Sequence, residues 1–121
     1  MIQKELKFLK GKKFLKLNDF VEDKNANSES YFYKGKNFPL VNKKLLECLK
    51  NISNFTKKSV RINLHNNPNS KKHNMIILHR MNSNLNIHSH EREGETVQMI
   101  EGKVKINFYK QNFKITKKIY L

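Results

Sequence analysis

The clearest periodic signal in the chain is helical and lies between residues 42 and 53. Apolar residues recur there at spacings that place them on one stripe of a helix: Leu45, Leu46, Leu49 and Ile52. Asn42 precedes the stripe and has a side chain suited to capping a helix N-terminus. Cys48 lies beside the stripe, where we expect a buried and unreactive thiol. The pattern therefore predicts one short helix over residues 42–53.

From residue 59 onward the period of the pattern changes to two. In residues 59–65 every second residue is apolar, so Arg61 and His65 are expected on the opposite, polar face of a strand. Similar short segments, separated by turn-forming sequences, follow at 75–80, 87–90, 96–101, 103–109 and 113–121. Regularly spaced short strands are typical of a β-sandwich or a small barrel. The predicted fold class is all-β with one short helix before the strands.

Residues 1–41 lack a comparable pattern. The stretch LKFLKGKKFLKL is compatible with a short strand or a hairpin around Gly11, and VEDKNANSES predicts a polar loop. A group of rings follows, and we expect it to anchor this segment on the main body rather than to stack on a ligand: Tyr31, Phe32, Tyr33 and Phe38. We therefore divide the chain into an irregular N-terminal arm, 1–41, and a helix with a β-barrel, 42–121, within one domain overall.

Length and composition narrow the class of protein. A chain of 121 residues is long enough for one domain with its own core. The single cysteine excludes an internal disulfide framework and favours a reducing, cytoplasmic setting. No apolar run approaches the roughly 20 residues that span a bilayer, so no membrane association is expected.

The formal net charge of +15 is compatible with anionic partners of several kinds. Nearly all of the positive residues are lysines, and they are scattered along the chain rather than gathered on one element. Nucleic-acid sites usually depend on arginine, whose planar fork reads bases and phosphates. The composition therefore argues against nucleic acid, and fits an acidic small molecule such as a sugar nucleotide equally well.

The strongest candidate for chemistry lies in IHSHEREGETVQMIEGKV, residues 87–104. His88 and His90 are two residues apart, so on a strand their imidazoles point to the same face. Gly94 allows a turn after which Glu95 opens the returning strand and brings a carboxylate beside the rings. Two imidazoles and one carboxylate form a facial ligand set for a divalent transition metal (Zn, Fe, Mn or Ni), with other positions left open.

The spacing of these residues resembles the first motif of the cupin superfamily. His88-x-His90, four residues, Glu95, six residues and Gly102 match that motif, although Asn82 stands where the motif has its leading glycine. With RINLH at 61–65 and MIILHR at 75–80, the chain resembles the WbuC-type cupin-fold metalloproteins. The resemblance implies a small jelly-roll-like β-barrel and a context of surface-polysaccharide biosynthesis.

The resemblance also has a gap. Cupins usually supply a fourth ligand, a histidine, from a second motif of the form PxG-x-x-H, and no such segment occurs before Leu121. Either the chain is truncated relative to the family, or the site uses fewer ligands. His65 is a further candidate ligand, because it lies in the RINLH segment. A missing final hairpin would leave an open edge strand, which favours a homodimer.

Further side chains are candidates for contacts with a substrate. Arg61 and Arg80 could bind a carboxylate or phosphate through two parallel hydrogen bonds. His79 and Tyr109 are weaker candidates for the wall of a substrate pocket. Besides a metalloprotein, the pattern allows a metal-free sugar-nucleotide isomerase or epimerase with a histidine as general base and Tyr109 or Tyr31 as acid. It also allows a non-catalytic binding module.

Overall fold

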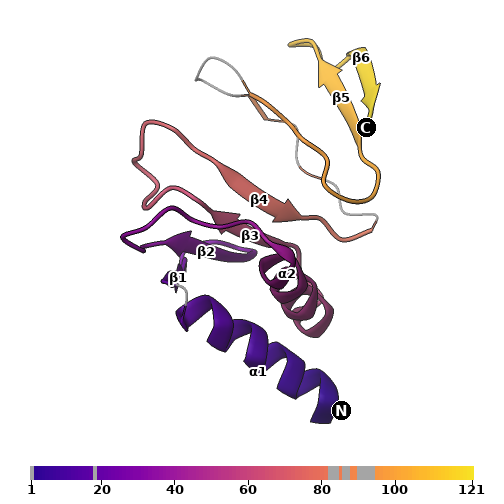
Figure 1. Ribbon diagram of the computed structural model, residues 1–121. Coiled ribbons are helices and arrows are strands. Elements are labelled where there is room, and N and C mark those ends of the chain that lie inside the picture. Colours follow the sequence, from indigo (N-terminus) through magenta and orange to yellow (C-terminus); the bar gives the residue numbers. More distant parts are fainter. Residues whose placement is uncertain (1, 18, 82–84, 86–87, 90–94) are drawn as a thin grey trace. The chain divides into compact units, whose positions relative to one another are not determined.

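The computed structural model of the protein describes residues 2–17, 19–81, 85, 88–89 and 95–121. The chain divides into two compact units, Met1–Ser83 and Asn84–Leu121. The described part of the first unit contains two helices and a four-stranded sheet, and that of the second contains a two-stranded sheet (Figure 1). The prediction of a closed all-β barrel is therefore wrong, since the fold is mixed α/β and neither sheet closes on itself. Alternation along a strand shows which side chains share a face, but it does not show which strands pair.

The N-terminal segment is a regular helix, α1, over Ile2–Leu17, and the predicted hairpin around Gly11 is wrong. The residues that face α2 recur three and four positions apart, as a helix requires: Phe8, Gly11 and Leu15. The ring of Phe8 stacks on Phe55 of α2, with centroids 4.1 Å apart and an interplanar angle of 13°. Lysines interrupt this stripe in the sequence, and all of those in the helix except the half-buried Lys12 are exposed.

The second helix, α2, spans Lys43–Thr56 and confirms the prediction from the apolar stripe. Asn42 caps it, because its side-chain oxygen accepts a hydrogen bond of 3.0 Å from the backbone N–H of Leu45. Cys48 is buried as expected, and burial raises the pKa of its thiol to about 11. Within the described part of the chain, neither helix has the length and apolarity needed to cross a bilayer.

The larger sheet has the strand order β1-β2-β3-β4. Its strands are β1 (Phe20–Glu22), β2 (Glu29–Tyr33), β3 (Val60–Asn63) and β4 (Met75–Leu78). β2 and β3 are parallel because α2 connects them, while the outer pairs are antiparallel. Strands were predicted at the positions of β3 and β4, but not at those of β1 and β2.

Both helices lie on one side of this sheet and close its core (Figure 1). Tyr31 and Ile62 are neighbours in the parallel register and point toward the helices. Eight buried side chains from three strands and two helices form the core cluster: Leu15, Phe20, Tyr31, Leu45, Leu49, Ile52, Val60 and Ile62.

In the second unit, β5 (Lys105–Tyr109) and β6 (Ile115–Tyr120) lie where strands were predicted, and they form an antiparallel pair. Two backbone hydrogen bonds between Val104 and Leu121, of 3.0 and 2.9 Å, extend the pairing. Strands were also predicted at 87–90 and 96–101. Residues 88–89 and 95–101 lie outside any strand, so those two predictions are wrong for the described positions.

Candidate functional site

Two members of the predicted metal set lie in the described part of the second unit. The side chains of His88 and Glu95 are both exposed, and each takes part in contacts with its surroundings. His90 and the turn residue Gly94 fall outside the described residues. Among the described residues, no three histidine, cysteine or acidic side chains converge on one point. Gly102 has a φ of +83°, a conformation that favours glycine, in the bend that precedes β5.

Arg61 and His65 come from the first unit, at β3 and just beyond its end. The Nε–H of Arg61 donates to the hydroxyl of Ser30 across the parallel strand pair, at 3.4 Å. Asn63 donates through Nδ2 to the same hydroxyl, and to the carbonyl of Tyr31, both at 3.0 Å. Ser30 and Asn63 are almost completely buried, so these hydrogen bonds satisfy polar groups on the sheet face that α2 does not cover. The sequence indicated no partner for Arg61, because the parallel pairing of β2 with β3 was not predicted.

His65 lies between two other rings. The ring of His73 stacks on it with centroids 4.1 Å apart and an interplanar angle of 12°, and Phe32 meets it edge to face at 5.7 Å. The backbone N–H and carbonyl of Asn74 both lie within hydrogen-bonding distance of His65 Nδ1, at 3.2 and 3.1 Å. This ring is therefore held by its neighbours, with Nδ1 engaged by the backbone.

The environment of His65 disfavours the charged imidazolium. Burial is the main cause that lowers the pKa of His65, and the positive charges of His73 and Arg61 lower it further. The hydrogen bond to the Asn74 carbonyl acts in the opposite direction. His73 is exposed and lies outside any strand. The antiparallel register of β3 and β4 places it opposite His65, and this pairing was the signal that could have revealed the ring pair.

Arg80 connects the end of α2 to the segment after β4. Its Nη1 donates to the carbonyl of Ser53 at 2.8 Å and to the Ser53 hydroxyl at 3.1 Å, and its backbone N–H donates to Ser59 Oγ at 3.3 Å. The guanidinium thus adds a second hydrogen bond to a carbonyl near the C-terminus of α2, which also accepts the backbone N–H of Lys57. His79, its neighbour, is exposed.

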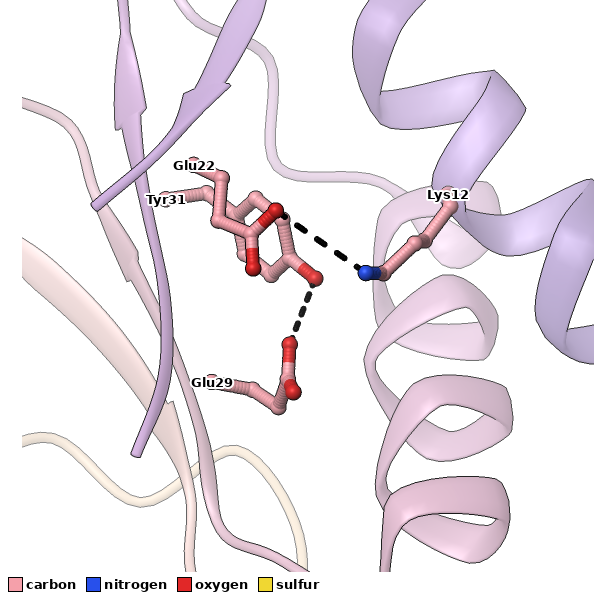
Figure 2. Close-up of polar contacts among 4 residues, drawn as sticks. All are labelled: Lys12, Glu22, Glu29 and Tyr31. Carbon is pink, nitrogen blue, oxygen red and sulfur yellow. Dashed lines mark hydrogen bonds and ion pairs between the residues drawn. The ribbon is translucent and has the colours of Figure 1, made fainter. Parts of the chain in front are cut away.

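The two tyrosines considered as acids have different surroundings. Tyr109 ends β5 and is 37% exposed. Tyr31 is buried, and its hydroxyl donates to Glu29 Oε2 at 2.8 Å (Figure 2). Burial raises the pKa of Tyr31 above its usual range, and the neighbouring Glu29 carboxylate adds to the shift. Close by, Lys12 of α1 and Glu22 of β1 form an ion pair at 3.9 Å (Figure 2). Tyr31 therefore belongs to the buried core, with its hydroxyl bound to Glu29 of the same strand.

The candidate residues thus fall into two groups. Arg61 and His65 lie close together on one face of the larger sheet, while His88, Glu95 and Tyr109 belong to the second unit. Arg80 makes contacts that stabilise the fold.

Comparison with known proteins gives one match. The family model described as "Domain of unknown function (DUF6016)" matches residues 41–121, which include α2 and all elements after it. No curated protein and no solved structure matches the chain. Since the matched region covers more than half of its length, the chain belongs to the DUF6016 family.

Proposed function

We propose that the protein binds a divalent transition metal ion through His88, His90 and Glu95. The observation that carries this proposal is the donor set itself: two imidazoles and a carboxylate within eight residues, at the spacing of the first cupin motif. Zn, Fe(II), Mn and Ni all accept such mixed nitrogen and oxygen ligands. The exposure of His88 and Glu95 supports the proposal, because a hydrated ion can reach both side chains.

A metal held by three protein side chains keeps coordination positions open to water or to a small anion. Such an ion supplies Lewis acidity to an oxygen of the bound molecule. The resemblance to WbuC-type proteins now depends on the motif, since the barrel is not formed. We retain from it a sugar-derived small molecule as ligand and a context of polysaccharide biosynthesis. A cytoplasmic location, favoured by the single cysteine, and a homodimer are further parts of the proposal.

Metal analysis of the purified protein tests the proposal directly. After expression in metal-supplemented medium, we expect about one equivalent of a transition metal per chain. His90→Ala and Glu95→Gln should each lower that content strongly, while the exposed histidine variant His79→Ala serves as the matched control and should retain it. An occupancy below about a tenth of an equivalent in the unmodified protein would contradict the proposal.

A further inference from the structure

The connection from β2 through α2 to β3 creates a second candidate site in the first unit. Because β2 and β3 are parallel, their carboxyl ends meet at the same edge of the sheet. The loops that leave this edge are residues 34–42 after β2 and 64–74 after β3. In sheets with parallel strands, small ligands characteristically bind beyond the carboxyl ends of those strands.

A pocket lies at this edge, between the two loops. Its volume is about 420 Å³, within the range of small-molecule sites. Tyr33 and Leu64 line it with apolar surface, and both also pack against the buried core. Lys36, Asn37 and Asn66 add polar side chains to its wall. The pocket thus combines an apolar base with several groups that donate hydrogen bonds.

Specific contacts hold the pocket's shape. The Tyr33 hydroxyl donates to the backbone carbonyl of Asn37, which ties the strand end to its own loop. Gly35 lies directly against the Tyr33 ring, where any side chain would collide with it. Lys34 Nζ donates to the backbone carbonyl of Asn66 and thereby links the two loops. These contacts preorganise the pocket before a ligand binds.

The surroundings of the pocket indicate an anionic ligand with a flat ring. The two loops contain four lysines and no acidic residue: Lys34, Lys36, Lys71 and Lys72. Phe38, which lines the pocket, is 92% exposed, so nearly all of its ring is accessible for stacking. The ring stack of His65 and His73 is not part of this wall, because His65 alternates with Leu64 along the chain.

We propose that this pocket binds a mononucleotide, with the base stacked on Phe38 and the phosphates beside Lys36. Stacking of the base on Phe38 gives a role to this exposed ring, and lysine ammonium groups attract phosphate as point charges. The site uses none of the residues of the proposed metal set, so either proposal can fail without the other.

Calorimetric titration of the full chain with ADP and UDP tests the inference. EDTA in the buffer excludes any contribution from a metal at His88, His90 and Glu95. We expect saturable binding that Phe38→Ala weakens by about tenfold or more, through loss of base stacking. Lys36→Ala should also weaken binding, and the weakening should shrink at high salt.

Matched variants and probes complete the design. Phe113→Ala removes a ring that is 70% exposed in the second unit, and Lys24→Ala removes an exposed lysine outside the pocket; both should bind as the unmodified protein does. Absence of saturable binding, or equal binding by Phe38→Ala, would overturn the proposal. Inorganic phosphate binding as tightly as ADP would overturn the base contact. Preference for a single-stranded oligonucleotide over a nucleotide would assign the surface to nucleic acid instead.

Discussion

At the scale of single residues, the best-defined chemistry in the described chain is the environment of His65. Its ring is stacked on His73, close to Arg61, and bonded to the backbone of Asn74. Each of the neighbouring positive charges disfavours a proton on the ring, as does its partial burial. His65 is therefore expected to remain neutral at pH values where a free histidine is already charged.

This environment makes stability depend on pH in a defined direction. The pKa of His65 is lower in the folded state than the ordinary value of 6.5, so the unfolded chain binds the proton more readily. The stabilisation that the neutral His65 ring provides is complete above about pH 6.5. It is lost as the pH falls through that value toward the pKa of His65 in the folded state. We predict an NMR titration midpoint for the His65 ring below 6.5.

His73→Ala provides the matched variant for this titration. Removing the second imidazole removes a charge that lowers the pKa of His65, so the midpoint should rise toward that of an ordinary histidine. An unchanged midpoint would contradict the electrostatic role assigned to His73. The free energy of unfolding, measured in urea, should fall less between about pH 7.5 and about pH 5.5 for His65→Gln than for the unmodified chain.

At the scale of elements, a glycine in the middle of α1 lies at the contact between α1 and α2. A Cβ atom added to Gly11 would lie 3.5 Å from the Cys48 carbonyl oxygen and 3.5 Å from Ile52 Cγ1, both ordinary contact distances. Alanine also has a better helix propensity than glycine by about 1 kcal/mol. We predict that Gly11→Ala stabilises the protein by about 0.5–1 kcal/mol, measured as a higher midpoint of urea unfolding.

A larger side chain at the same position provides the contrast. Gly11→Leu would force the two helices apart and should lower the midpoint. Destabilisation by Gly11→Ala as well would show that the helices tolerate no added methyl group at this crossing.

The elements that could be predicted are those whose pattern had a single interpretation. α2 has a clean stripe with a cap, and Ile106 and Phe108 of β5 alternate with polar residues. β2 was missed because Tyr31, Phe32 and Tyr33 are all aromatic, which hides the period of two. In the structure Tyr31 points into the core, and Phe32 lies on the opposite face beside His65. The chain therefore uses both faces of β2, a use that alternation cannot signal.

The proposed metal site is a prediction of donor residues alone, and the sequence does not predict their geometry. Spacing alone led to the hypothesis that His88, His90 and Glu95 form a ligand set. Val97 and Met99 lie outside any strand in the structure. Strand formation there requires a partner for their backbone hydrogen bonds, and the local sequence does not specify such a partner. The same reason explains why the pocket beyond β2 and β3 was missed: it exists only because two segments far apart in sequence are parallel neighbours.

At the scale of the whole molecule, the excess of positive charge opposes folding. A net charge of +15 on 121 residues brings lysines close together when the chain becomes compact, and their repulsion is released on unfolding. Added salt screens this repulsion over a Debye length of about 10 Å at 0.1 M. We predict that the midpoint of urea unfolding rises as sodium chloride is increased from about 20 mM to about 300 mM.

A fall in the midpoint over this range would indicate that favourable ion pairs outweigh the repulsion. The ion pair between Lys12 and Glu22 is half-exposed and 3.9 Å long, so it contributes little on its own. Lys12→Ala should therefore leave the direction of the salt effect unchanged.

The parallel pairing of β2 with β3 also has a consequence for biosynthesis. The ribosome synthesises β1 and β2 before β3. The edge of β2 that will pair with β3 therefore stays unpaired until Asn63 has emerged. During that interval the nascent chain exposes an open strand edge with three aromatic residues in a row, a typical template for mispairing between chains. The time needed to translate residues 34–59 therefore separates the synthesis of β2 from that of β3. Slow synthesis across these residues should favour aggregation of the nascent chain over its folding.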